Sequence, residues 1–361
     1  VRIEDLLGRT PIVLSKENIF KDLENKTILV TGGAGSIGSE LVRQILNFNP
    51  KKLWIFDQAE TPLYDLQQEL KVTGGSHKCE LVIGDVSQKE RVRHLLEECK
   101  ADVIFHAAAY KHVPLMEENP SEAVLTNISG TKHLADEAIR QKVGKFILIS
   151  TDKAVNPTNV MGATKRAAEM YCEAMNGTSE TKFIATRFGN VLGSNGSVIP
   201  LFKKQIREGG PLTVTHKDVT RFFMTIPEAV QLVLEAGTMG KGGEVFVFDM
   251  GESIRIYDLA EKMLKLSGLE EGKDIEIRFT GLRPGEKLYE ELLTSEENTI
   301  ETHHPKIMIA KLSSENQEAS IKKISELILL FDGQNNEALV KMLKEIVPEF
   351  KSQNSIYTRL D

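Results

Sequence analysis

The glycine-rich stretch at positions 31–38, which reads TGGAGSIG, constrains the fold more than any other part of this chain. It joins an apolar run at 27–30 to a segment with helical periodicity at 41–46. Glycines at such a junction permit a tight turn, let the backbone approach a pyrophosphate and allow the helix to pack closely on the strand. The helix N-terminus supplies N–H donors and the positive end of its dipole. We therefore predict a dinucleotide site rather than a glycine-rich turn without a ligand. Its residues are Gly32, Gly35, Ser36, Ile37 and Gly38.

Short apolar runs rich in β-branched residues alternate with longer amphipathic segments over most of the chain. This alternation is typical of βαβ units around a parallel sheet, whose buried strands are almost continuously apolar. The pattern predicts an α/β fold with a doubly wound, Rossmann-type parallel sheet. We expect its strands at residues 27–30, 53–56, 80–83, 103–105, 146–149, 183–186 and 245–248.

Glycine-rich loops interrupt this pattern after residue 190, and loops at the carboxyl ends of strands are where α/β folds bind ligands. We therefore expect a second, smaller lobe that is partly interleaved with the first. The N-terminal arm should dock on the protein surface or on a neighbouring subunit, and the C-terminal tail should pack as helices. The expected parts are an arm or linker (1–25), a nucleotide-binding domain (26–190 with a strand near 244–249), a substrate lobe (191–330) and a helical tail (331–361).

Composition excludes several classes of function. The 45 basic and 52 acidic residues are mixed along the chain and give a net charge of −7, so no basic stripe is available for nucleic acid. Cys79, Cys99 and Cys172 lack CxxC spacing, which argues against a disulfide framework and a zinc site and favours a reducing cytoplasm. The chain contains no long apolar run and no signal peptide, so we expect it to be soluble as given. Because it starts at Val1 without Met, we expect an upstream portion.

An acidic residue closes the second predicted strand. The Asp57 carboxylate is placed to accept both hydroxyls of an adenosine ribose, and it would repel a 2′-phosphate. Because Gln58 and its neighbours include no Arg, NAD is favoured over NADP as the cofactor. Asp85, after the third strand, is placed to meet the adenine amino group, and capping of its own loop is an equal alternative.

Three chemically active residues, Thr151, Asp152 and Lys153, follow the fifth predicted strand directly. They should lie at the carboxyl edge of the sheet, facing a nicotinamide. Adjacent acid and ammonium groups more often form a surface ion pair, but this position favours catalysis. Desolvation and the charge of Lys165 would favour the amine form of Lys153 that a base requires. On the next predicted helix, Met161 and Lys165 are four residues apart and therefore share a face.

Five motifs of this chain resemble the extended short-chain dehydrogenases, and more closely the polysaccharide-biosynthesis branch that contains UDP-N-acetylglucosamine 4,6-dehydratases. They are TGGAGSIG (31–38), HAAAYKHVP (106–114), STDK (150–153), RFGNV (187–191) and RPGEK (283–287), and the similarity spans residues 1–310. In the wider family a catalytic Tyr precedes the Lys that holds the nicotinamide ribose. Here Met161 replaces this Tyr, while Lys165 remains. Long, membrane-anchored members of the branch carry Met there and retain the configuration at C5, so the resemblance implies a retaining enzyme.

The resemblance implies a lyase that dehydrates UDP-N-acetylglucosamine in an internal redox cycle, with NAD bound tightly and recycled. Hydride leaves C4 for NAD while Thr151 relays the O4 proton. Lys153 then removes the C5 proton, and protonated Asp152 protonates the departing C6 hydroxyl before hydride returns to C6. The product is a UDP-4-keto-6-deoxy sugar of D-xylo configuration. A cationic Lys153 opposes protonation of Asp152, so we treat these two residues as one coupled site.

The resemblance also implies further binding residues. Asn190, Arg221 and Arg283 would hold the diphosphate, which arginine binds in a bidentate way, and Glu286 would accept the uridine ribose hydroxyls. A surface charge at Arg221 and a Glu286–Lys287 ion pair are the structural alternatives. The remaining cofactor residues implied are Gln58, Val86, Ala107, Ala108 and Ala109. The remaining substrate residues implied are Lys111, His112, Glu117, Val198 and Pro200, with core or loop roles equally open for His112 and Glu117.

Residues 1–9 resemble the linker that follows a block of transmembrane helices in the long members. The resemblance therefore implies that an absent N-terminal region anchors the full-length bacterial protein to the cytoplasmic face of the inner membrane. A homo-oligomer, at least a dimer, is expected from the same likeness. Two alternatives stay open, namely a UDP-sugar 4-epimerase and a non-catalytic NAD-binding sensor or scaffold. Epimerisation removes no proton from C5, which argues against the first alternative, and a sensor would form no 4-keto product.

Overall fold

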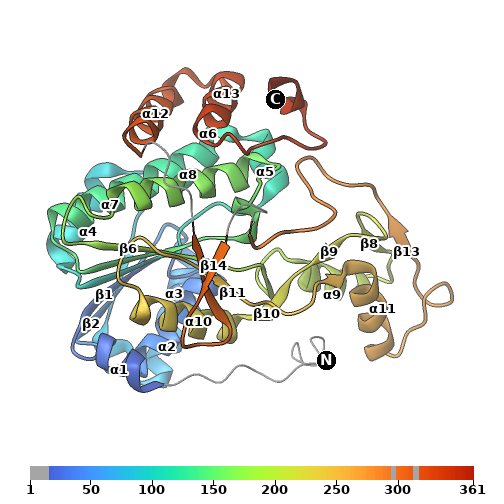
Figure 1. The fold of residues 1–361 in the computed structure, drawn as a ribbon. Helices are drawn as coiled ribbons and strands as arrows, with labels where there is room; N and C mark the ends of the chain where they lie inside the picture. Colours follow the sequence, from blue (N-terminus) through green and yellow to red (C-terminus); the bar gives the residue numbers. More distant parts are fainter. Residues whose placement is uncertain (1–15, 294–297, 312–316) are drawn as a thin grey trace.

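A computed structural model of the chain describes residues 16–293, 298–311 and 317–361 (Figure 1). The linker-like segment at 1–9 lies outside these residues. Of the predicted arm, the described part forms helix α1 (Lys16–Leu23), which packs on α10. In the described part of the chain, no helix is both long enough and apolar enough to cross a bilayer.

A nine-stranded sheet in the order β14-β15-β11-β6-β5-β4-β1-β2-β3 forms the centre of the molecule (Figure 1). All the predicted strands are confirmed, and neighbours from β3 to β11 pair in parallel, as in a Rossmann-type fold. The order reverses between β1 and β4, and α/β proteins bind ligands at the carboxyl ends of strands at such a switch point. The parallel strands are β1 (Thr27–Thr31), β2 (Lys52–Asp57), β3 (Cys79–Ile83), β4 (Val103–His106), β5 (Lys145–Ile149), β6 (Lys182–Arg187) and β11 (Val245–Phe248).

Two antiparallel strands that the pattern did not predict, β14 (Asn298–Glu301) and β15 (Ile307–Lys311), extend this sheet at β11. They lie within the 191–330 segment that was expected to form the substrate lobe. The expectation of a lobe over that whole segment is therefore corrected at its C-terminal end. Strand β15 buries Ile307 and Ala310 against the sheet. A short strand with these buried side chains is therefore sufficient to extend the sheet, and no long apolar run is needed.

Helices cover both faces of the sheet because side chains alternate along each strand. In β1, Leu29 belongs to one apolar core, whereas Ile28 and Val30 belong to the other. The first core lies under α4 (Lys89–Cys99), α7 (Gly130–Arg140) and α8 (Val160–Met175), with α12 (Gln317–Leu329) and α13 (Asn336–Ile346) packed on α8. The second lies under α2 (Ser36–Leu46), α3 (Glu60–Thr73) and α10 (Ile226–Met239). The predicted helical tail thus completes the first layer.

A third apolar core defines the smaller lobe, drawn on the right of Figure 1. Its centre includes Phe202, Leu212 and Met263. Three two-stranded pairings build it, β7 with β10, β8 with β13 and β9 with β12. Its elements are β7 (Asn190–Leu192), α9 (Val198–Arg207), β8 (Leu212–Val214), β9 (Thr220–Arg221), β10 (Phe223–Thr225), β12 (Ile254–Arg255), α11 (Ile256–Leu266) and β13 (Ile277–Phe279). Short elements from the first part of the chain complete the fold: η2 (Ser76–Lys78), α5 (Val113–Glu118), α6 (Pro120–Ala123), a π-helical turn η3 (Val124–Ser129) and η4 (Asp152–Ala154).

The C-terminal segment at 351–355, which we call the strap, joins two distant loops before the last turn, η6 (Ile356–Leu360). Its backbone donates from Lys351 to the Pro157 carbonyl at 3.0 Å and from Gln353 to the Thr158 carbonyl at 3.1 Å. The Gln353 carbonyl in turn accepts from the Gly285 amide at 2.8 Å. The strap therefore holds the RPGEK loop beside the N-terminus of α8.

Candidate active site

The glycine turn between β1 and α2 has almost no free space. Gly32 has a φ of +64°, and a Cβ there would lie 2.6 Å from the Ala108 amide nitrogen. A Cβ at Gly38 would lie 2.0 Å from the Gly32 carbonyl oxygen. Both positions therefore require glycine, because any side chain would separate the turn from its neighbours. This is the close backbone approach that a pyrophosphate cradle needs.

We expect Gly38→Ala to destabilise the protein by about 1–3 kcal/mol, because its methyl group overlaps the carbonyl of Gly32. Gly35→Ala is the matched control, since a Cβ at Gly35 lies 3.3 Å from the same oxygen. Urea unfolding of both variants measures the difference. Equal loss of unfolding free energy in the two variants would contradict the overlap at Gly38.

Asp57, at the end of β2, accepts hydrogen bonds from backbone amides, including one in the glycine turn. One carboxylate oxygen accepts the Ala34 amide at 2.9 Å, and the other accepts the Ala59 amide at 2.9 Å. Each oxygen keeps a second lone pair, so binding of ribose hydroxyls is compatible with this geometry. Asp85 accepts the Ser87 amide at 2.8 Å, which is the loop-capping alternative foreseen for it.

A pocket over the carboxyl ends of β1, β2 and β4 brings together most of the predicted cofactor residues. Ser36 and Ile37 do not line it. The Ser36 hydroxyl accepts the Asn195 amide at 3.2 Å, which ties α2 to a loop of the smaller lobe, and Ile37 packs against the second core. The pocket is lined by Gly32, Gly35, Phe56, Asp57, Gln58, Gly84, Asp85, Val86, Ala107, Ala108, Ala109 and Thr126.

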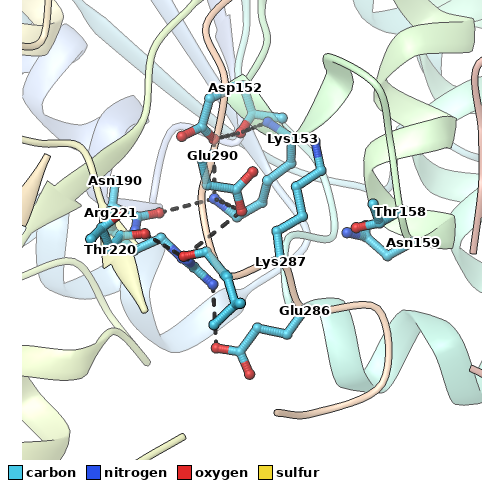
Figure 2. A network of polar contacts seen from close by, with 12 residues as sticks. Asp152, Lys153, Thr158, Asn159, Asn190, Thr220, Arg221, Glu286, Lys287 and Glu290 are labelled. Atoms are coloured by element: carbon cyan, nitrogen blue, oxygen red, sulfur yellow. Dashed lines mark hydrogen bonds and ion pairs between the residues drawn. The ribbon is translucent and has the colours of Figure 1, made fainter. Parts of the chain in front are cut away.

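Asp152 and Lys153 turn inward at the end of β5 (Figure 2). The Asp152 side chain is 0% exposed and that of Lys153 is 17% exposed, so the surface ion pair alternative is wrong. The Lys153 ammonium nitrogen lies 3.1 Å from Oδ1 of Asp152 and 3.1 Å from Oδ1 of Asn190. The Thr151 hydroxyl donates to the same Asp152 oxygen at 3.0 Å. The structure thus brings the predicted acid, base and Thr151 into one hydrogen-bonded group.

Met161 and Lys165 lie on α8, as predicted, and both are buried. The Lys165 ammonium donates to the Ile149 carbonyl at 2.7 Å, which fixes its nitrogen at the end of β5. Burial lowers the pKa of Lys165 to about 8. Met161 packs in the first core, where its thioether offers no acidic proton to a substrate.

A buried ion pair supports the strand ends beneath these residues. Glu169 of α8 and Arg187 of β6 are 0% and 1% exposed and meet at 2.7 Å. Glu169 also accepts from the Ser150 hydroxyl at 2.5 Å and from Arg166 at 3.2 Å. Burial alone would raise the Glu169 pKa, but Arg187, Arg166 and Ser150 together lower it to about 2. Glu169 thus anchors the residue that precedes Thr151.

Arg221 is buried rather than a surface charge, which corrects that alternative. Its guanidinium donates to the Thr220 carbonyl at 2.7 Å and lies 3.3 Å from Oε1 of Glu286. Arg283 contacts the other Glu286 oxygen through its amide at 3.0 Å and its side chain at 3.3 Å. The alternative of an ion pair between Glu286 and Lys287 is also wrong, because Lys287 forms its ion pair with Glu291 at 3.2 Å. Two of the predicted diphosphate residues, Arg221 and Arg283, therefore form one cluster with the predicted ribose residue Glu286, whereas the Asn190 side chain accepts from Lys153.

Lys111 and His112 border the loop that enters the smaller lobe. The Lys111 ammonium donates to the Asn195 carbonyl at 2.9 Å, and burial, followed by the charge of Lys153, lowers its pKa. Gly196 stands against the His112 ring, where a Cβ would approach Cε1 to 2.6 Å. Val198 and Pro200 are half-buried on the first turns of α9.

Glu117 has a structural role in place of the predicted contact with the sugar. One carboxylate oxygen accepts the Val160 amide at 2.5 Å, at the start of α8, and the other accepts the Ser355 hydroxyl at 2.6 Å. Burial raises the Glu117 pKa, which these two donors partly offset. Glu117 therefore caps the helix that carries Lys165 and connects it to the strap. Among the described residues, no three His, Cys, Asp or Glu side chains form a metal-binding group.

A family model described as "Polysaccharide biosynthesis protein" matches residues 28–312. The chain belongs to this family. The capsular polysaccharide biosynthesis protein CapD of Staphylococcus aureus is 53% identical over 331 residues, covering 91% of this chain and 54% of CapD. A probable polysaccharide biosynthesis protein of Bacillus subtilis, EpsC, is 52% identical over 312 residues, covering 86% of this chain and 52% of EpsC. The chain thus spans about half the length of these two curated relatives.

Other relatives carry the names of specific enzymes. The inverting UDP-N-acetylglucosamine 4,6-dehydratase of Campylobacter jejuni is 36% identical, covering 83% of this chain and 88% of the relative. The UDP-glucose 4-epimerase of Rickettsia canadensis is 38% identical, covering 76% and 79%. The solved structure of Pen from Bacillus thuringiensis superposes with a TM-score of 0.75 at 38% identity and covers 84% of this chain and 98% of that one.

Sequence reasoning missed one residue of this site. Glu290 follows the RPGEK loop, and its side chain is 4% exposed. Its Oε1 lies 3.9 Å from both Lys153 and Arg221 (Figure 2). In the sequence Glu290 and Glu291 form an adjacent acidic pair, and glutamate is a residue that mostly lies at the surface. Its burial depends on partners far away along the chain, so no local signal marks it.

Proposed function

We propose that this chain is the catalytic part of an NAD-dependent UDP-N-acetylglucosamine 4,6-dehydratase that retains the configuration at C5. The observation that carries the proposal is the buried, hydrogen-bonded pair of Asp152 and Lys153 at the carboxyl end of β5. Elimination of water needs a base and an acid on one site. The family membership and the names of the dehydratase relatives support this choice of chemistry.

The residues present fit an NAD molecule. The glycine turn leaves a cradle that a Cβ would fill, and Asp57 stands at the end of β2 with free lone pairs. Gly32, Gly35 and Asp57 would hold the dinucleotide, and Lys165 would hold its nicotinamide ribose. When bound, NAD would accept hydride from C4 of the hexose and return it to C6, which makes an external reductant unnecessary.

Proton movements would then fall to three side chains. Thr151 relays the proton of the C4 hydroxyl. The Lys153 amine removes the C5 proton, which the neighbouring ketone acidifies, and protonated Asp152 delivers a proton to the departing C6 hydroxyl. The proton that Lys153 takes from C5 would return to Asp152 across the hydrogen bond of 3.1 Å between them. When hydride reaches C6, a proton from solvent would be added at C5, while the proton from O4 would leave to solvent through Thr151, so that the net change is loss of one water.

Substrate binding would use the Arg221, Arg283 and Glu286 cluster. The two guanidinium groups would hold the diphosphate, and Glu286 would turn one oxygen to the uridine ribose. In the full-length protein, a region before residue 1 would anchor this chain to the cytoplasmic face of the inner membrane. We also propose that it works as a homo-oligomer.

The decisive experiment supplies the purified chain with UDP-N-acetylglucosamine and NAD in deuterated water. We expect a UDP-4-keto-6-deoxy sugar that carries deuterium at C5 and has the D-xylo configuration, measured by NMR coupling constants. An L-arabino product would contradict retention. A C4 epimer without deuterium at C5 would instead show an epimerase, the activity for which several relatives are named. If the chain binds NAD but forms no product, the alternative of a non-catalytic sensor would be favoured.

A further inference from the structure

Glu290 lies beside the catalytic pair, and one of its carboxylate oxygens is unsatisfied among the described residues. Its Oε1 lies 3.9 Å from the Lys153 nitrogen and 3.9 Å from Nε of Arg221, and its Oε2 has no hydrogen-bond partner among the described residues. Oδ2 of Asp152 is also buried without a partner among them. Two buried carboxyl groups thus face one lysine (Figure 2).

The groups around Glu290 come from three segments. Asp152 and Lys153 lie after β5, Arg221 belongs to β9, and Lys287 precedes Glu290 on its own loop. Burial raises the Glu290 pKa most, the Asp152 charge raises it further, and the three cations lower it. Two close carboxylates in a buried site favour retention of one proton between them.

We propose that Glu290 is a positioning residue whose charge decides whether Lys153 is present as an ammonium or as an amine. The inference rests on the proposed dehydration. An ionised Glu290 stabilises the ammonium, which cannot accept the C5 proton. A protonated Glu290 leaves Asp152 as the one ionised carboxylate within 4 Å of Lys153 among the described residues. Loss of the second negative charge favours transfer of the lysine proton to Asp152, which gives the amine and the acid. No proton is gained or lost in this exchange, because the one that Lys153 releases appears on Asp152.

The direct test is an NMR titration of the full chain with ¹³C-labelled lysine, in which the Lys153 Cε signal is assigned from a Lys153→Arg variant. Glu290→Gln removes the negative charge at nearly constant shape. We expect the Lys153 titration midpoint to fall by about one to two pH units, because an opposite charge at this distance has been lost. Glu290→Asp keeps the negative charge, so the Lys153 midpoint of this variant should lie close to that of the unaltered chain.

Glu291→Gln is the matched control, since Glu291 is the next residue and pairs with Lys287 outside the catalytic group. It should leave the Lys153 midpoint in place. A Glu290→Gln midpoint equal to that of the unaltered chain would overturn the proposal, as would an equal shift in Glu291→Gln. If Glu290→Gln fails to fold, Glu290→Ser takes its place, because it removes the same charge with a smaller side chain. An unmoved Lys153 midpoint in that variant would likewise overturn the proposal.

Activity gives a separate readout that keeps the two hypotheses distinct. In a working dehydratase, Glu290→Gln should move the acid limb of the kcat/KM profile to lower pH, because the amine form persists there. An unaltered chain that forms no 4-keto sugar would contradict the proposed function alone, and the NMR titration would still decide the role of Glu290. An active chain whose acid limb does not move in Glu290→Gln would contradict the role of Glu290 alone.

Discussion

Lys153→Met should stop deuterium incorporation at C5 and lower the rate of 4-keto sugar formation by about a hundredfold to ten-thousandfold. Methionine approximates the length of the lysine side chain but cannot accept a proton. In the proposed mechanism, oxidation at C4 precedes removal of the C5 proton and does not need Lys153. The variant should therefore still reduce bound NAD when substrate is added, which a rise in NADH absorbance would measure.

Lys217→Met is the control for this experiment, because Lys217 is an exposed lysine of the smaller lobe. It should keep deuterium incorporation at the level of the unaltered chain. Thermal unfolding of Lys153→Met must be measured as well, since the substitution leaves Asp152 without its cation. A folded Lys153→Met protein that incorporates deuterium at C5 at the normal rate would exclude Lys153 as the base.

Glu169→Gln should cost about 3–5 kcal/mol of unfolding free energy, because it removes the buried negative charge that contacts the Arg187 guanidinium at 2.7 Å and Arg166 at 3.2 Å. Glutamine also turns an amide donor toward one of these two guanidinium groups, which can only donate. Urea unfolding, extrapolated to water, gives the free energy. Glu173→Gln is the control one turn further along α8. Burial raises the Glu173 pKa, so removal of that charge should leave stability unchanged or slightly higher.

The Glu169 network should also set an acid limit to stability. The pKa of Glu169 is lowered from its ordinary 4.5 to about 2 in the folded protein. Its contribution is therefore fully present above about pH 4.5, and it is lost as the pH falls toward 2. Glu169→Gln should remove this dependence. A variant with the same acid unfolding curve as the unaltered chain would show that another carboxylate sets the limit.

Local patterns predicted most of the sheet because its parallel strands, except β3 at the edge, are buried on both faces. Their apolar runs and the glycine turn are properties of short segments, and the position of Asp57 and of the 151–153 group follows from the strand that precedes each. The antiparallel strands β14 and β15 are short, with one at the sheet edge, and their pairing with β11 is a long-range contact. Such strands carry a much weaker local pattern.

The roles of individual carboxylates were less predictable, because each depends on partners from other segments. Glu117 and Glu290 each stand in a pair of adjacent glutamates, of which the sequence does not show which member is buried, and both are buried. Glu117 meets Val160 and Ser355, whereas Glu290 meets Lys153 and Arg221. Arg221 and Glu286 likewise lie far apart in the sequence and come into contact only in the folded structure. A charged residue in a loop therefore gave no indication of its burial or of its partner.

The strap has a consequence for biosynthesis. A ribosome releases the N-terminal sheet strands long before residues 351–355 emerge, and domains generally begin to fold in that order. The RPGEK loop and the start of α8 can be joined only after residues 351–355 have left the exit tunnel. A nascent chain should thus form its nucleotide-binding half before the strap fixes the RPGEK loop, so that products truncated before residue 351 should lack an ordered loop.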